Sequence, residues 1–221
     1  MNKEEKIVLA WCDTGMVTGE FAFSILSNKP DNIIDILRSS GKKIATQRQE
    51  VFDIWMSSDY DHADWILWID SDIYPSQEDI NNIIKLADKD KFPVLSGLYF
   101  TLINNTPTPC SFMKDKIKKV YSKISIEDIN KKDIVEVDAT GFGMLLMHRS
   151  VGKRLLDAFG YKHFFLEEQD INNHSNFIGE DLMFCQHLEE ISVPIHVHTG
   201  IVPKHIKSIA VDEKLYHLYN K

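Results

Sequence analysis

The sequence has few cysteines, no long apolar run and a shortage of positive charge, and each deficit excludes a class of protein. Its three cysteines, Cys12, Cys110 and Cys185, are scattered and contain no CxxC pair. An odd, dispersed set predicts free thiols in a reducing, cytoplasmic compartment and disfavours a disulfide framework or a structural zinc site. The apolar run 7–11 near the N-terminus is too short for a signal peptide or a membrane span.

Positive charge is outnumbered, with 25 Lys and Arg residues against 33 Asp and Glu residues and a formal net charge of -8. This balance argues against a nucleic-acid duplex or an anionic membrane surface as the main partner. It is still compatible with a phosphate ligand, because one bound metal ion reverses the local sign of a site.

The remaining composition is that of an ordinary globular protein, with 43% hydrophobic residues in a chain long enough for one sizeable core. No internal repeat or low-complexity linker divides the sequence, so we expect a single domain over 1–221. Short apolar runs alternate with helical patterns in the first half, and this alternation predicts an α/β fold.

Apolar periodicity and turn residues place the expected elements along the chain. Strands are predicted at 7–11, 33–37, 65–69, 93–100, 135–139, 144–148 and 193–197. Helices are predicted at 21–26, at 43–56, from Ser76 with Asp79 in the capping-box position, from Ser150 to about Gly160, and from Gly179. The Lys-rich stretch 114–133 is interpreted as an exposed hairpin or insertion, and 104–109 as a turn-rich loop.

The acidic triplet Asp70-Ser71-Asp72 directly follows the apolar run 65–69, which is typical of a strand covered on both faces. In open α/β sheets, ligands bind at the carboxyl ends of the strands. An extended backbone would put Asp70 and Asp72 on the same side, where a divalent cation shared with a diphosphate would offset their repulsion. The alternative interpretation is a turn that ends the strand before Pro75.

The segment WILWIDSDIYPSQEDI resembles the metal-binding segment of GT-A-fold glycosyltransferases, particularly the family 2-like enzymes of bacteria and phages. Three further segments fit that family in the same order, so the resemblance covers most of the chain except its Lys-rich middle. It implies a Rossmann-like, nucleotide-binding mixed sheet flanked by helices, with a nucleotide-binding half, 1–100, and an acceptor-binding half, 101–221. It also implies that Asp72 is a metal ligand and that Asp70 binds the donor ribose, the metal, or both.

Two further segments carry charged residues whose roles have alternatives. Arg48 lies in a helical apolar stripe and either extends to the surface or reaches the donor phosphates. The resemblance favours the phosphates, although Gln49 stands where the family often has Asn. Glu180 and Asp181 at a helix start are explained by first-turn capping alone. The resemblance instead makes Asp181 the general base for the acceptor hydroxyl and gives Glu180 an orienting role.

Three histidines, His196, His198 and His205, surround the last predicted strand. A His-x-His pair on one strand face can bind a metal, but such residues are more often ordinary strand residues. The resemblance implies a metal-ligating histidine after this strand, for which His205 is the first choice and His198 the second. One imidazole with the carboxylates of Asp70 and Asp72 suits Mn²⁺ somewhat better than Mg²⁺.

Two turns complete the predicted donor site. Asp13, after the first strand, would lie beside the base and ribose, although the Pro that is common there in the family is missing. Gly141 and Gly143 resemble a glycine turn that lines the donor-sugar and acceptor pocket, with a plain tight turn as the alternative. The loops 104–109 and 172–176 are candidates for a lid over the donor.

The resemblance, carried over to these residues, implies a metal-dependent, inverting glycosyltransferase that moves a sugar from a UDP- or GDP-linked donor to a hydroxyl of a carbohydrate or another acceptor. Retention stays open, since a fold does not fix stereochemistry. A sugar nucleotidyltransferase is one alternative, but the turn Asp13-Thr14-Gly15 lacks the basic residues that usually hold a triphosphate. A non-catalytic carbohydrate- or nucleotide-binding protein of the same fold is the other, and it would not need Asp72, Asp181 and His205 together.

Overall fold

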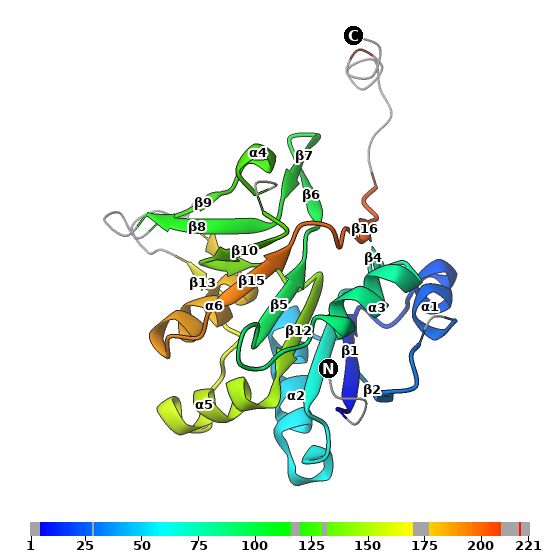
Figure 1. The fold of residues 1–221 in the computed structure, drawn as a ribbon, viewed down its shortest axis with the longest axis vertical. Helices are drawn as coiled ribbons and strands as arrows, with labels where there is room; N and C mark the ends of the chain where they lie inside the picture. Colours follow the sequence, from blue (N-terminus) through cyan, green and yellow to red (C-terminus); the bar gives the residue numbers. More distant parts are fainter. Residues whose placement is uncertain are drawn as a thin grey trace.

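A seven-stranded mixed sheet forms the centre of the molecule, with strand order β10-β15-β5-β12-β3-β1-β2 (Figure 1). The computed structural model describes residues 5–27, 29–115, 120–129, 132–169, 177–208 and 217. The sheet strands are β1 (Ile7–Asp13), β2 (Ile33–Ser40), β3 (Trp65–Ile69), β5 (Val94–Gly97), β10 (Ile134–Val137), β12 (Met144–His148) and β15 (Ile195–His198). β1 pairs in parallel with β2 and β3, and β5 with β15, whereas β12 runs antiparallel to β3 and β5.

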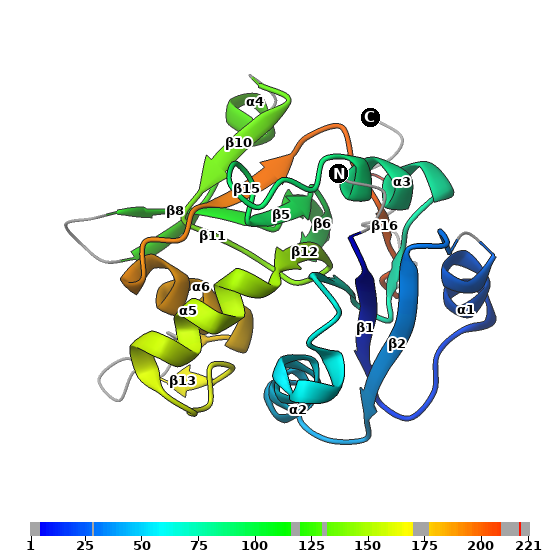
Figure 2. The ribbon, with the colours of Figure 1, turned by 60° about the horizontal axis from the view of Figure 1, so that its bottom comes forward.

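Helices cover both faces of this sheet (Figures 1 and 2). One face packs against α2 (Ile44–Met56), α5 (Arg149–Phe159) and α6 (Glu180–Glu190), and the other against α1 (Gly19–Leu26) and α3 (Gln77–Lys85). All five residues of β3 are buried, as expected for a strand between two helical layers. Ser76 and Asp79 form the predicted capping box at the start of α3. These observations confirm the predicted α/β fold in one domain.

Smaller strand pairs extend the second half of the chain. β6 (Phe100–Ile103) pairs with β7 (Thr106–Pro109), and β8 (Ser111–Asp115) lies between β9 (Val120–Lys123) and β11 (Ala139–Thr140). The Lys-rich stretch 114–133, predicted as an exposed hairpin or insertion, contains the end of β8, the β9 strand that pairs with it, and the short α4 (Ile126–Ile129). The remaining elements are η1 (Ser58–Tyr60), β4 (Ile73–Tyr74) with β16 (Lys204–His205), and β13 (Glu168–Gln169) with β14 (Phe177–Ile178).

Three local predictions were wrong. The strand predicted at 135–139 is divided, because β10 ends at Val137 and β11 begins at Ala139 in another sheet. The single strand predicted at 93–100 is divided, because β5 ends at Gly97 and β6 begins at Phe100. The loop predicted at 104–109 is instead a tight turn followed by β7, with Asn104 and Asn105 at φ values of 50° and 62°. Asparagine tolerates this left-handed region better than other residues that carry a side chain. The second lid candidate, 172–176, lies outside the described residues.

A buried arginine fixes the position of α2. Arg149 donates from Nη1 to the carbonyl oxygens of Trp55 (2.6 Å) and Tyr60 (2.8 Å), and from Nη2 to Asp61 (2.7 Å). These acceptors lie at or just beyond the carboxyl end of α2, where carbonyl groups lack helical partners. The contact joins that helix end to the start of α5 and so holds the helix that carries Arg48. Within the described ranges no helix has the length and apolarity needed to cross a membrane.

Candidate active site

The acidic triplet lies at the carboxyl end of β3, but its backbone is a turn rather than an extended segment. The Ile73 amide donates to the Asp70 carbonyl at 2.9 Å, and the Asp70 amide donates to the Gly143 carbonyl at 3.1 Å. The expectation of two carboxylates side by side on an extended strand was therefore wrong, and the turn interpretation is correct for the backbone. As a result, the carboxylates of Asp70 and Asp72 have different partners.

The partner of Asp70 is Arg48, which is 4% exposed and lies inside the protein rather than at its surface. Its Nη2 is 2.9 Å and 3.2 Å from the two carboxylate oxygens of Asp70, and its Nη1 is 3.4 Å from Glu180 Oε1. The guanidinium carbon also lies 4.5 Å from the centre of the Phe142 ring. Burial alone would lower the pKa of Arg48, but the neighbouring carboxylates outweigh it and raise that pKa. The guanidinium thus binds carboxylates from β3 and α6.

Glu180 and Asp181 begin α6, as predicted, after Gly179 at the N-cap. Asp181 Oδ1 accepts from the Leu182 amide at 2.8 Å, whereas Gly179 at the N-cap makes no side-chain capping hydrogen bond. The pKa of both carboxyl groups is raised by burial, an effect that Arg48 partly offsets. Glu180 and Asp181 therefore lie near a buried cation and bind protons more readily than ordinary carboxylates, as a general base must.

The predicted glycine turn lies against Tyr99, which the sequence interpretation missed. A Cβ atom on Gly141 would be 1.8 Å from the Tyr99 hydroxyl, and one on Gly143 would be 2.7 Å from its ring. Oδ2 of Asp181 lies 3.2 Å from the same Cβ position on Gly141. Tyr99 is 6% exposed, and burial raises the pKa of its phenol. Only glycine leaves room here for Tyr99, and no sequence signal marked that residue.

Of the two candidate histidines, the structure brings His205 and not His198 to the acidic triplet. His205 Nε2 lies 3.0 Å from Asp72 Oδ2, and Nδ1 donates to the Phe100 carbonyl at 2.7 Å. Because a carbonyl can only accept, Nδ1 carries a proton and Nε2 is the nitrogen directed at Asp72. His198 ends β15 and its Nδ1 accepts from the Gly200 amide at 3.1 Å.

Asp72 has a second cationic partner, because Lys207 Nζ lies 2.6 Å from the same oxygen, Oδ2. Burial would raise the pKa of Asp72, but His205 and Lys207 lower it to about 2. Among the described residues no group of three or more His, Cys, Asp or Glu side chains is arranged to hold a metal ion. Asp72 and His205 supply a carboxylate and an oriented imidazole, a donor pair that suits Mn²⁺, while Asp70 faces Arg48 instead.

Asp13 ends β1 and is directed at protein groups. Its carboxylate accepts from Arg38 Nε (2.6 Å) and Nη2 (3.0 Å), from Trp11 Nε1 (3.0 Å) and from the Gly15 amide (2.7 Å). The hydrogen bonds from Arg38 lower the pKa of Asp13. Asp13 therefore lines the carboxyl edge of the sheet with its carboxylate oxygens already engaged.

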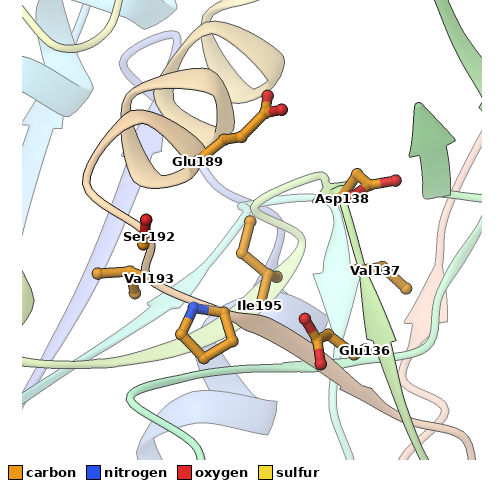
Figure 3. A pocket seen from close by; sticks show the side chains of 8 residues that line it. Glu136, Val137, Asp138, Glu189, Ser192, Val193 and Ile195 are labelled. Atoms are coloured by element: carbon orange, nitrogen blue, oxygen red, sulfur yellow. The ribbon is translucent and has the colours of Figure 1, made fainter. Parts of the chain in front are cut away.

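A cleft of about 350 Å³ opens beside these groups at the carboxyl ends of β1 and β3. It is lined by Cys12, Asp13, Thr14, Lys42, Ile44, Gln47, Arg48, Asp70, Ser71 and Asp72. A smaller cavity of about 240 Å³ lies at the start of β15, between β10 and the end of α6 (Figure 3). A further cavity of about 460 Å³ is lined by Tyr74, Pro75, Ser76, Asp79, Gly200, Val202 and Lys204. None of the predicted site residues lines either of these two cavities, so the cleft beside β1 and β3 is the candidate ligand site because of its residues and not its size.

Solved structures share this fold. The chain aligns with A197 from STIV at a TM-score of 0.62 and 16% identity, over 92% of this chain and 86% of that chain. It aligns with GalNAc-T7, solved with UDP, GalNAc and Mn²⁺, at a TM-score of 0.61 and 8% identity. That alignment covers 95% of this chain but 45% of GalNAc-T7, so this chain spans less than half of that protein.

These likenesses define the class of fold, which is GT-A-like: a mixed sheet with helices on both faces and the cleft at the carboxyl ends of its strands. The fold implied by the resemblance is confirmed. No protein-family model matches the sequence, and no curated protein matches it either. The finer assignment to a family 2-like group stays a prediction.

Proposed function

We propose that this protein is a glycosyltransferase that takes a sugar from a nucleotide-sugar donor and passes it to an acceptor hydroxyl. The observation that carries the proposal is the convergence of Asp70, Glu180 and Asp181 around the buried Arg48, next to a cleft of about 350 Å³. These acidic groups come from distant parts of the chain and meet at the edge of the sheet where α/β folds bind ligands. The GT-A-like fold supports the same function.

The donor would occupy the cleft beside β1 and β3, with its diphosphate near Asp72. Asp72 and His205 would hold a divalent cation, Mn²⁺ or Mg²⁺. When bound, this ion would neutralise the negative charge that develops on the departing nucleoside diphosphate. The carbonyl of Phe100 fixes the His205 ring with Nε2 directed at Asp72, and a bound cation would replace the proton that Nε2 donates to that carboxylate. Arg48 would act on the site by holding Asp70 and Glu180 in place.

Asp181 is the proposed general base, acting with inversion at the anomeric carbon. Oδ1 is held by the Leu182 amide, while Oδ2 faces the Gly141 turn and would take the proton of the acceptor hydroxyl. Asp181 has a raised pKa, and a carboxylate with a raised pKa is a stronger base. General-base catalysis is most efficient when the pKa of the base lies near the working pH. Glu180, bound to Arg48, would orient the acceptor side of the site.

The two halves of the chain would divide these tasks. Residues 1–100 would supply the nucleotide-binding half, and 101–221 the acceptor-binding half with its Lys-rich insertion at 114–133. The donor would be linked to UDP or GDP, and the acceptor would be a carbohydrate or another hydroxyl compound. The three cysteines are free thiols, which supports the proposed cytoplasmic location.

A screen of UDP- and GDP-sugars for metal-dependent hydrolysis and thermal stabilisation tests this function. Asp72→Ala should abolish the metal-dependent part of donor binding, whereas Asp90→Ala should not. Asp90 is an exposed carboxylate that precedes β5, so it lies near the amino end of that strand and away from the carboxyl ends that form the cleft. Unchanged donor binding in Asp72→Ala would refute the proposed metal site. Formation of a sugar nucleotide from a nucleoside triphosphate and a sugar phosphate would instead identify a nucleotidyltransferase.

The base is tested separately, once a donor is known. Asp181→Asn should keep donor affinity and slow transfer by about 10²–10⁴-fold, because it removes the proton acceptor. Asp157→Asn, which alters an exposed carboxylate on α5, is the matched control. Loss of donor binding and transfer together in Asp181→Asn would point to the capping role alone. Absence of any nucleotide or metal binding by the wild-type protein would support a carbohydrate-binding function without catalysis.

A further inference from the structure

A short segment near the C-terminus, residues 204–207, contacts Asp72 and is called the C-terminal ribbon below. β16 pairs with β4, which begins immediately after Asp72, and the two strands lie side by side in Figure 1. The Ile206 amide donates to the Asp72 carbonyl at 2.9 Å. On either side of this bond, His205 Nε2 and Lys207 Nζ approach Asp72 Oδ2 at 3.0 Å and 2.6 Å. Three consecutive residues of one ribbon thus contact one aspartate.

The Lys207 contact has a direct electrostatic consequence. A lysine ammonium is a compact point charge with donors only, and it occupies one of the positions from which a cation can approach the Asp72 carboxylate. The side chains of Lys207 and Asp72 are 38% and 44% exposed, so the pair is accessible to ions from solution. A divalent ion that binds Asp72 through Oδ2 must therefore take the place of this ammonium.

We propose that Lys207 is a built-in counter-ion of Asp72, displaced when a divalent cation binds, and that this exchange makes metal and nucleoside diphosphate bind cooperatively. The inference rests on the proposed function, because it assumes that Asp72 is a metal ligand. A displaced ammonium next to a divalent ion is electrostatically unfavourable. The negative diphosphate relieves this repulsion, and the flexible four-carbon stem of lysine allows the ammonium to follow it.

The ribbon itself offers a matched control. Lys204 stands opposite Tyr74 in the β16–β4 pair and is exposed. Adjacent residues in a strand point to opposite sides, so Lys204 faces away from the side on which His205 meets Asp72. Lys204 and Lys207 therefore contribute the same charge to the neighbourhood, while only Lys207 makes the contact that the proposal invokes.

Titration of Mn²⁺ without nucleotide, followed by paramagnetic resonance of the free ion, tests the exchange in the wild type, Lys207→Met and Lys204→Met. Removing an exposed competing ion pair should tighten Mn²⁺ binding by about fivefold in Lys207→Met. Lys204→Met should change it by less than about twofold. Addition of UDP or GDP should then strengthen Mn²⁺ binding less in Lys207→Met than in the wild type. Thermal melts of the three proteins check that each is folded.

Unchanged or weaker Mn²⁺ binding in Lys207→Met overturns the inference. An equal gain in Mn²⁺ affinity in Lys204→Met also overturns it, because the gain would then come from the loss of any nearby positive charge and not from the contact with Asp72. Failure to detect Mn²⁺ binding in all three proteins also overturns it. The readout needs no sugar and no turnover. If Lys207→Met gains affinity and no nucleotide sugar is consumed by the wild type, the counter-ion role is supported while the proposed transferase activity fails.

Discussion

Replacing Gly141 with alanine tests how tightly the glycine turn is packed against Tyr99. The new Cβ atom would lie 1.8 Å from the Tyr99 hydroxyl oxygen and 3.1 Å from the ring carbon that carries it. Either the buried ring or the turn must move, and overpacking of this kind costs about 2–3 kcal/mol of the free energy of unfolding. For a chain of this size, that loss lowers the thermal midpoint by roughly 4–12 °C.

The double variant Gly141→Ala/Tyr99→Phe isolates the hydroxyl. Tyr99→Phe alone should cost about 1 kcal/mol, because it removes a buried hydroxyl that influences the pKa of the Cys110 thiol. In the double variant the nearest ring atom is 3.1 Å from the new Cβ atom, so the main overlap disappears. The two changes should therefore be coupled by about 1–2 kcal/mol in a double-mutant cycle of denaturant unfolding.

Gly143→Ala is the control for this cycle. Its Cβ atom would lie 2.7 Å from two ring carbons and 2.9 Å from a third, and these atoms remain in phenylalanine. Tyr99→Phe should therefore fail to restore the stability of Gly143→Ala. Equal rescue at both glycines, or rescue at neither, would refute the reasoning, because the hydroxyl would then not be the atom that excludes a side chain at Gly141.

Three further substitutions test individual charged side chains. Arg149→Met should lower the free energy of unfolding by about 2 kcal/mol, since the Trp55 carbonyl loses its arginine donor while the Tyr60 carbonyl keeps the Ala63 amide; a loss under about 1 kcal/mol in denaturant titrations would contradict this. Arg48→Met should raise the pKa of Glu180 and Asp181 further, because Arg48 lowers both; unshifted carboxyl resonances in an NMR titration would argue against the contact. Asp72, with a folded pKa of about 2 against 3.8, should contribute stability that is present above about pH 4 and lost as the pH falls through 2. Because its side chain is 44% exposed, this contribution should be about 1 kcal/mol, and the stability difference between wild type and Asp72→Asn should shrink over that range.

The sequence allowed prediction of those features that depend on neighbouring residues. The unbroken apolar run 65–69 predicted a strand between two layers, and Ser76 with Asp79 predicted a helix start, since burial and capping are visible in local patterns. The family resemblance also ranked His205 above His198 as the histidine near Asp72, and the contact is present.

Other features of the site depend on contacts between distant residues and left no local signal. Lys207 meets Asp72 across 135 positions, and Arg48 meets Asp70 across 22. Tyr99 reads as an ordinary strand residue, although it explains both glycines of the turn. A single charged residue in an apolar stripe, such as Arg48, indicates that a partner of opposite charge is required. Which residues become its partners depends on how β3 and α6 pack in the folded protein, and the sequence does not show this.

Arg48 has a consequence for how this chain can change over time. Arg48 is 4% exposed and is paired with one carboxylate from each half of the chain, Asp70 and Glu180. Removing either acid leaves the other to balance the charge, whereas removing both would leave a buried cation without a contacting carboxylate, a defect that costs several kcal/mol. The cluster therefore holds more negative than positive charge, and this surplus adds to burial in raising the pKa of Glu180. Over evolutionary time such a site can lose one of the two acids and stay folded, but it cannot lose both while it keeps Arg48.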